Sequence, residues 1–566
     1  MKKHIAAAAA LLTLPLVASA QGATDGYNFS QTDLKGTARF MSMGGAFGAL
    51  GGDLSTLSQN PAGIGVYRHS EIGFTVDLDC QRATSNSSGL TVGQNQTKFL
   101  LNNIGGVATW RLGSSAIPNF NLGFTYNKAA SFNRRYRGSI GNLQTSMSNY
   151  VAGLANGSEY TVGDLTSTSD YNPYNPQDGG IAPGWLPILG YDSYLITPSG
   201  NPDYPVWDGQ FGNGTSGSGT FDVTESGGVN EYNIALGGNI NNIVFWGMDF
   251  GIINMNYSQS TMWSESLDNA YVNGEEIANS TWTLGNGYTA SANGFNYKLG
   301  VIVKPIQELR LGFAFHTPTW YSVSESYQGR INFNDPSRDF APASAITNNG
   351  NPGYNNYNFQ TPWRFMFSAA GVIANRLILS ADFEWEAFNT MNFSDQNPYV
   401  YDWGYDNGWG YDDWWSWYRP TAEGQGGAAT RSPESFANTN QDIEQYYQTS
   451  YNLRIGAEFR VTDNFSVRAG YNYVSSPVRA SARNNAETIY TVGTNPAYRF
   501  DNTTNYVTCG LGYKTGGFYV DLAYIYKHKE AEYHAFTPDP TSSIQSPSSK
   551  LSLNNNQIVL SMGFKF

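Results

Sequence analysis

Charge is scarce in this chain of 566 residues. Asp, Glu, Lys and Arg together make up 14% of it, whereas soluble globular proteins usually contain about 25%. The net charge of −13 gives the chain no electrostatic reason to bind nucleic acid. Histidine is rare as well, with five copies, and no GxSxG or HExxH motif occurs. We therefore expect no enzymatic activity, and the sequence implies no cofactor.

Paired cysteines and long apolar runs are also missing. Cys80 and Cys509 lie far apart at apolar positions, which favours two unpaired thiols over a disulfide. After the first twenty residues there is no stretch of about 18 apolar residues, so a helical inner-membrane protein is excluded.

The first twenty residues have the features of a secretory signal peptide. Lys2 and Lys3 precede an apolar stretch at residues 5–17, and Ala18-Ser19-Ala20 matches a small-x-small cleavage site. The apolar stretch is shorter than the roughly 20 residues of a spanning helix, which favours cleavage over a membrane anchor. We expect the mature chain to start at Gln21, outside the cytoplasm.

Aromatic residues are abundant, at 15%, and many fall in segments that alternate between apolar and polar residues. Ile558, Leu560, Met562 and Phe564 show this alternation near the C-terminus, as in a strand with one apolar face. About fourteen segments follow the pattern, near residues 71–80, 103–112, 119–127, 231–240, 244–257, 294–303, 308–322, 363–373, 376–390, 450–460, 465–474, 505–513, 517–526 and 557–566.

The connections between these segments alternate between short and long. Six are tight, and the others are longer, notably residues 129–230 and 392–449. Outer-membrane barrels have short periplasmic turns and long external loops, and an open sheet edge is not stable in lipid. The predicted fold is therefore all-β, a closed antiparallel transmembrane β-barrel of about 14 strands over residues 71–566.

Aromatic residues support a location in the outer membrane of a Gram-negative bacterium. The terminal Phe566 suits recognition by the barrel-assembly machinery of that membrane. An aromatic girdle at the lipid headgroups is expected from residues near the ends that lead into long loops, namely Tyr126, Tyr257, Tyr321, Trp385, Tyr473, Tyr524 and Tyr526.

Residues 21–70 precede the first strand and form a hatch, or plug, in this interpretation. Gly48 and Gly52, with Gly44 extending the row, have the small-x-x-x-small spacing that lets a short helix lie against another backbone. Asn60-Pro61-Ala62-Gly63 predicts a turn. No GK[ST] sequence follows, which excludes a phosphate-binding loop.

Two stretches of the sequence resemble the FadL/TodX family of outer-membrane transporters of long-chain fatty acids and other hydrophobic compounds. GGAFGALGGDLSTLSQNPAG is similar to the hatch of that family, and RLGFAFHTPTWY is similar to its mid-barrel strand and following loop. The resemblance implies a fourteen-stranded barrel with a movable hatch. It assigns gating to Asn60, Pro61, Ala62, Gly63, Asp53, Gly48 and Gly52.

The same resemblance implies passive diffusion of a hydrophobic ligand, which leaves sideways into the membrane lipid through a kink in the third strand. That strand lies near residues 119–127, where Gly123 could allow the kink; an ordinary small residue facing the lumen is the alternative. The resemblance is absent from residues 129–230, which leaves external ligand capture open. We expect the barrel to work as a monomer.

Cationic residues at lumen-facing positions are candidates for binding a carboxylate head group. They are Arg310, His316, Arg364, Arg454, Arg468 and Lys298. The alternative is that they pair across the lumen with acidic residues of the opposite strands, namely Asp249, Asp382, Glu384, Glu386 and Glu458.

Residues 399–420 are rich in Trp, Tyr and Asp. They suit an external surface that adsorbs apolar ligands or sugars, although a self-packed loop is an equal alternative. Their Asp spacing does not match an EF-hand calcium loop. A structural or adhesive outer-membrane barrel is therefore the alternative to the predicted channel, and haem or an aromatic compound is an alternative ligand.

Overall fold

The computed structural model describes residues 22–87, 90–114, 116–176, 183–272, 274–334, 342–374, 376–396, 399–400, 430–431, 436–483, 489, 491, 493–537, 544 and 546–566. The predicted signal peptide and residues 401–420 of the aromatic loop lie outside the described residues, and with them the proposed adhesive surface.

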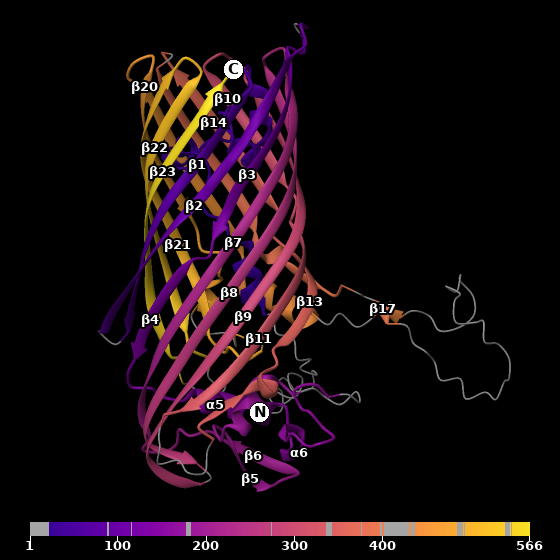
Figure 1. Ribbon diagram of the computed structural model, residues 1–566, viewed down its shortest axis with the longest axis vertical. Helices are drawn as coiled ribbons and strands as arrows, with labels where there is room; N and C mark the ends of the chain where they lie inside the picture. Colours follow the sequence, from indigo (N-terminus) through magenta and orange to yellow (C-terminus); the bar gives the residue numbers. More distant parts are fainter. Residues whose placement is uncertain are drawn as a thin grey trace, which may run out of the picture.

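Within these residues the chain forms a closed antiparallel β-barrel (Figure 1). Each strand pairs with its sequence neighbours, and β1 closes the barrel by pairing with β23, from Glu71 with Lys565 to Asn86 with Lys550. Nineteen strand segments share this sheet. Four of the barrel strands consist of two segments each, and the short β12 (Ser344–Ile346) pairs only with the end of β11. The wall therefore has fourteen strands, as predicted.

The strands occur in the predicted order, separated by the six predicted short turns. Their bounds are β1 (Glu71–Ser87), β2 (Leu90–Arg111), β3 (Asn119–Ser131) with β4 (Arg134–Ile140), β7 (Ser216–Ile240), β8 (Val244–Val272), β9 (Glu275–Val303), β10 (Leu309–His316) with β11 (Trp320–Phe333), β13 (Gly353–Gln360) with β14 (Arg364–Ile373), β15 (Leu377–Ala387) with β16 (Asn392–Ser394), β19 (Thr449–Arg460), β20 (Phe465–Val474), β21 (Tyr498–Thr515), β22 (Phe518–His534) and β23 (Ser548–Lys565).

Side chains alternate between the lipid and the lumen along each strand. On β1, Ile72, Phe74 and Leu78 are exposed on the outer face, whereas Glu71 and Asp77 are buried inside. Cys80 and Cys509 are free thiols, as predicted. No helix in the described part of the chain is long and apolar enough to cross a membrane.

Several strands extend far beyond their predicted ends. β8 and β9 have 29 residues each, so residues 258–293 form a strand hairpin rather than the predicted loop (Figure 1). The apolar parity inverts beyond Ile252: the outward Asn254 and Asn256 are polar, while the inward Met255 is fully buried. Beyond the bilayer, the outer face of the barrel meets water and the apolar side chains point into the lumen. A search for strands with apolar outward residues therefore could not find these extensions.

The girdle prediction is wrong for two tyrosines. Tyr257 and Tyr321 are buried in the lumen, with 2% and 4% of their surface exposed. Tyr257 follows the inverted parity of the β8 extension. Residues 317–319 interrupt the ladder between β10 and β11, and this break moves Trp320 to the outside and Tyr321 to the inside.

The predicted external loop 129–230 is largely folded. It contributes β4, α5 (Met147–Gly157), α6 (Val162–Leu165), α7 (Trp185–Asp192), the hairpin β5 (Thr197–Asn201) and β6 (Tyr204–Asp208), and the first half of β7. Val151, Ile188 and Leu189 pack in one apolar cluster with Trp263 and Trp282 of the barrel. The helices and the hairpin, called the cap below, lie at the end of the barrel opposite the C-terminus (Figure 1).

Three further short elements complete the described chain. α8 (Ala437–Tyr446) belongs to the predicted loop 392–449, and α9 (Ala480–Arg483) follows β20. β17 (Tyr399–Val400) and β18 (Thr430–Arg431) form a separate two-stranded sheet.

Candidate functional site

The N-terminal residues 22–67, called the hatch segment, lie inside the barrel. They form α2 (Ala23–Ser30), α3 (Ala38–Ser42), α4 (Thr56–Gln59) and the 3₁₀ helix η1 (Pro61–Val66). α3 packs against β20 to β23, and η1 packs against β3, β7, β8 and β9. The hatch segment therefore reaches from one side of the lumen to the other.

Asn60 joins two parts of the hatch segment. Its side chain is fully buried; Nδ2 donates to the Gly48 carbonyl at 2.6 Å, and Oδ1 accepts from the Ala62 amide at 3.1 Å. Pro61 begins η1, a position where the missing N–H costs nothing. The Gly63 carbonyl accepts from the Gly52 amide at 3.1 Å. The predicted turn is thus a 3₁₀ helix held to the preceding glycine-rich stretch.

The glycine-rich stretch is not the predicted helix. Gly44 and Gly52 have φ angles of +64° and +69°, which a right-handed helix excludes. Gly48 instead lies directly on the wall: a Cβ there would be 2.0 Å from Ser368 Oγ, and its amide donates to Asp382 Oδ2 at 2.9 Å. Asp53 accepts from Thr37 Oγ1 at 2.8 Å, so it stabilises the hatch segment internally.

Inward-facing glycines of the wall receive the hatch segment. A Cβ on Gly300 would lie 1.9 Å from Asn60 Oδ1, and one on Gly247 would lie 2.1 Å from the Pro61 carbonyl oxygen. A Cβ on Gly470 would lie 2.2 Å from the Met43 carbonyl carbon. The sequence analysis did not predict this docking surface for the hatch segment. Glycine at inward positions of several strands indicates the close approach of another backbone and could have predicted it.

All six predicted lumen cations have partners within the protein. Four form ion pairs: Lys298 with Glu231 and Asp249, Arg364 with Glu386, Arg454 with Glu384, and Arg468 with Glu458 and Asp521. The other two contact the hatch segment: Arg310 Nη1 donates to the Leu50 carbonyl at 2.6 Å, and His316 Nε2 lies 2.7 Å from the Gln59 carbonyl oxygen. Their role in binding a head group stays a prediction.

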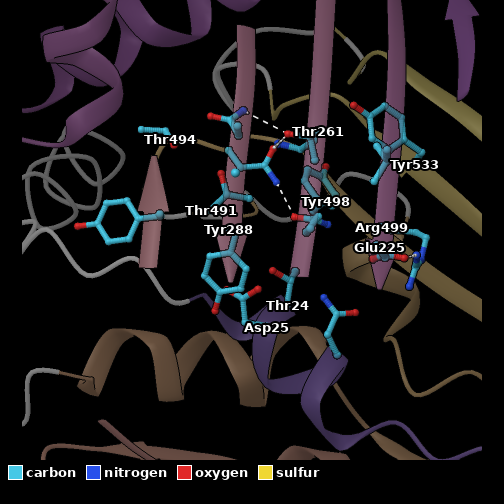
Figure 2. A pocket seen from close by; sticks show the side chains of 18 of the residues that line it. Thr24, Asp25, Glu225, Thr261, Tyr288, Thr491, Thr494, Tyr498, Arg499 and Tyr533 are labelled. Carbon is cyan, nitrogen blue, oxygen red and sulfur yellow. Dashed lines mark hydrogen bonds and ion pairs between the residues drawn. The ribbon is translucent and has the colours of Figure 1, made fainter. Parts of the chain in front are cut away.

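A pocket lies beside α2 in the lumen, between the hatch segment and the cap (Figure 2). Thr24 and Asp25 of α2 line it together with Tyr288 and Thr261 of the wall. Burial raises the pKa of Asp25 to about 7, and its position near Glu325 adds to this effect. The charge of this hatch helix is therefore partly suppressed at neutral pH where the helix borders the pocket.

Two buried polar atoms line this pocket without a hydrogen-bond partner among the described residues. They are Asn286 Oδ1 and Thr494 Oγ1, on residues with 8% and 2% of their surface exposed. Unpaired buried polar atoms are rare in native structures and call for an explanation.

A buried ion cluster borders the same pocket. Arg499 contacts Glu225 and Asp501, each at 2.9 Å, and Lys529 lies 2.8 Å from Asp501. Arg134 also pairs with Glu225. Sequence reasoning missed these residues because they lie on strand extensions that it assigned to loops.

The barrel wall has a gap between β2 and the third strand. β3 pairs with β2 only from Asn119 to Asn127, and it breaks at residues 132–133. β4 then packs against both β1 and β2, and Ser85 Oγ of β1 donates to the Arg137 carbonyl at 2.5 Å. Within the described chain, residues 90–101 of β2 therefore have a strand partner on one edge only.

Gly123 lies below this gap, in the regularly paired part of β3. Val107 and Ala235 are its neighbours on the two adjacent strands, and a Cβ there would lie 2.5 Å from Leu57 of the hatch segment. The strand leaves the wall after Asn127, where a bulge near Ala129 interrupts its pairing with β7, rather than at Gly123. Gly123 instead makes room for the hatch segment.

A family model decides the relationship of this chain to known proteins. Residues 239–526, just over half of the chain, match the family described as outer membrane protein transport protein (OMPP1/FadL/TodX). The chain belongs to this family. It is thus an outer-membrane transporter of hydrophobic compounds from a Gram-negative envelope, in agreement with the predicted localisation.

Solved structures resemble this FadL/TodX-family barrel in fold. A Pseudomonas aeruginosa FadL homologue is 13% identical with a TM-score of 0.50. The P. putida toluene transporter TodX is 11% identical with a TM-score of 0.48, and the Ralstonia pickettii toluene transporter TbuX is 13% identical with a TM-score of 0.46. Each alignment covers 94% of this chain and 99% of the other. No curated protein was found to match the chain.

Proposed function

We propose that this protein takes up long-chain fatty acids passively and releases them sideways through the barrel wall, with the hatch segment as the gate. The gap between β2 and β3 is the observation that carries this proposal. The cap lies over the outer end of the lumen and the hatch segment lies across its inner part. A side route through this gap would lead from the pocket to lipid without passing through either.

The position of the gap suits an apolar substrate. It opens above the last rung of the β2–β3 ladder, where Asn103 pairs with Asn127. Leu101 and Phe99 on the free edge of β2 are exposed on the lipid side. Burial of one CH₂ group is worth about 0.8 kcal/mol, and an acyl chain that moves directly into lipid keeps this free energy, whereas an aqueous exit forfeits it.

The pocket favours a substrate with a polar head over a pure hydrocarbon. Asn286 Oδ1 and Thr494 Oγ1 lack partners among the residues that the structure describes, and a protonated carboxyl group both donates and accepts hydrogen bonds. Toluene, which the names of two similar structures specify as their substrate, has no such group. Aromatic hydrocarbons are therefore the competing substrate class.

The gate consists of the residues that hold η1 against the preceding part of the hatch segment and against the barrel wall. Asn60, Pro61, Ala62 and Gly63 contact Gly48 and Gly52 within the segment and Gly300 and Gly247 on the wall. A shift of η1 would break these contacts together. Asp53 keeps the base of α4 attached to Thr37.

Photocrosslinking in outer membranes tests the route. A fatty acid with a photoreactive diazirine in its acyl chain is added to membranes that contain the protein, and adducts are mapped by mass spectrometry. We expect adducts on α2 and on both edges of the gap, at residues 99–103 and 127–134. A photoreactive phospholipid is the control, because it samples the lipid face only. Adducts confined to η1 and the periplasmic turns would contradict lateral release.

A further inference from the structure

A grid of uncharged polar side chains covers part of the outer surface of the barrel, above the lipid-facing band. It spans β8, β9, β11 and β13, whose pairing aligns their outward residues in rows. The three rows are Asn254, Asn293, Ser322 and Asn358; Asn256, Ser291, Ser324 and Asn356; and Ser258, Thr289, Ser326 and Tyr354. With strands about 4.8 Å apart and rows about 7 Å apart, the grid measures roughly 14 Å in each direction.

The grid begins where contact with acyl chains ends. The row beneath it contains Ile252, Phe295 and Trp320, and the rings of Phe295 and Trp320 lie 5.4 Å apart. Interfacial aromatic rings mark the headgroup level of a bilayer. The grid therefore faces the layer directly outside the hydrocarbon, on the side of the long connections and the cap, which is the outer leaflet.

The side chains of the grid are partly paired with each other. Asn254 Nδ2 donates to Asn293 Oδ1 at 3.0 Å, Ser324 Oγ donates to Asn356 Oδ1 at 2.6 Å, and Thr289 and Ser326 share a 2.8 Å bond. Asn256 Nδ2 also donates to Asn254 Oδ1 at 2.9 Å, and Ser322 and Asn358 bond to Gln396 and the Asp395 carbonyl. Amides and hydroxyls each have further donors and acceptors, which stay available to a ligand. The surface is also hollowed over the second and third rows, with Tyr354 among the lining residues.

The chemistry of the grid selects its occupant. Protein interfaces have an apolar core, but Tyr354, with 71% of its surface exposed, is the one large ring among these twelve residues. Lipid phosphates attract Lys and Arg, which the grid lacks. Sugar hydroxyls match amides and hydroxyls as mixed donors and acceptors, and the exposed ring of Tyr354 offers a stacking surface.

We propose that the grid binds neutral sugars in the saccharide chain of outer-leaflet lipopolysaccharide. The acyl chains of that glycolipid lie against the band below, so its saccharide is held beside the grid at high effective concentration. Lys128 of β3 is separated from the grid by one residue, Asn230 of β7, to which it donates at 3.1 Å, and it suits an acidic group of the same molecule. This site is separate from the lumen and does not depend on the transported substrate.

Binding of two purified lipopolysaccharides to the protein in detergent tests the proposal. One is rough lipopolysaccharide with its core oligosaccharide, and the other is a deep-rough form reduced to lipid A and its first acidic sugars. The wild type should bind the rough form at least tenfold more tightly. The variant Asn256→Ala/Ser291→Ala/Ser324→Ala should lose this preference, and Tyr354→Ala alone should reduce it at least threefold. Tyr204→Ala is the control, since Tyr204 is 83% exposed on the cap and should leave the preference unchanged.

Equal affinity of the wild type for both lipopolysaccharides would overturn the proposal, as would a triple variant that keeps the preference. The heat-dependent gel mobility of folded barrels shows which variants are folded. If the triple variant is not folded, the test rests on Tyr354→Ala, and an unchanged preference in that variant would overturn the proposal. Analytical ultracentrifugation tests whether a second copy of the chain occupies the grid instead. If the wild type is a dimer and the triple variant is a monomer, the grid is a contact between two copies of the chain and saccharide binding is refuted.

Discussion

Replacement of Asn60 by alanine is expected to release the hatch segment from its closed position. The Asn60 side chain is fully buried and makes two hydrogen bonds, at 2.6 Å to the Gly48 carbonyl and at 3.1 Å from the Ala62 amide. Asn60→Ala leaves both backbone groups buried without a partner. The wall beside them is formed by Gly300, which has no side chain to replace either bond.

The size of the effect follows from those two groups. An unsatisfied buried donor or acceptor costs about 1–3 kcal/mol, so two of them cost about 2–6 kcal/mol. Each 1.4 kcal/mol is about a tenfold change in an equilibrium. If the cost falls on the closed state, the population of hatch-open barrels rises roughly thirtyfold to ten-thousandfold.

Single-channel recording in planar bilayers measures this population. The wild type should be closed to ions for most of the recording, and Asn60→Ala should open frequently. Ser58→Ala is the control, because Ser58 lies two residues away, is partly exposed and donates only to the Ser55 carbonyl at 3.0 Å. Equal open probabilities for Asn60→Ala and Ser58→Ala, at equal insertion, would refute the role of Asn60 in closure.

Three further predictions concern α2, the ion cluster and a lipid-facing thiol. Burial raises the pKa of Asp25 to about 7, above its usual value of 3.8, so the contribution of the neutral form to docking of α2 is present at low pH and is lost as the pH rises through 7. Protection of residues 23–30 against hydrogen exchange, corrected for the intrinsic exchange rate at each pH, should fall between about pH 4 and 7, and Asp25→Asn should abolish that fall. Glu225→Gln removes a carboxylate shared by Arg134 and Arg499 and should lower stability by about 3–5 kcal/mol, measured by urea unfolding against the exposed control Asp268→Asn; an unchanged midpoint would contradict the pairing. Cys509 is a free thiol on the outer face, so a lipid-soluble maleimide should label it and a membrane-impermeant one should not. The reverse result would contradict the position of Cys509 on the lipid-facing side of β21.

The membrane-spanning part of the fold could be predicted from the sequence because lipid imposes a strict rule on it. Outward residues must be apolar there, so segments such as 557–566 show the period of two directly. The extensions beyond the bilayer follow the opposite rule, so Met255 and Tyr257 point into the lumen, although the predicted girdle had placed Tyr257 on the outside. The break at residues 317–319 moved Tyr321 inside because an interruption of the ladder resets the parity, which alternation alone does not reveal.

The candidate site was predictable in part. The sequence located the Asn60-Pro61-Ala62 element and the inward cations, since parity fixes which side chains enter the lumen. It named Asp249 and Glu384 among the possible partners of these cations, but it did not show which pairs form, because register is a property of strand pairing. The pocket was beyond prediction, because Asp25, Asn286 and Thr494 come from a helix, a strand extension and a loop that only the folded lumen brings together.

Uptake of radiolabelled oleate tests the central claim most directly. Cells that lack their own outer-membrane fatty-acid transporter carry the wild type, Asn60→Ala/Pro61→Ala or the empty vector, at equal surface levels. The account predicts saturable uptake with the wild type above the vector and faster uptake with the hatch variant, because its hatch segment is open more often, with toluene a weak competitor. Wild-type uptake no faster than the vector, by a protein that is correctly inserted, would contradict fatty-acid transport.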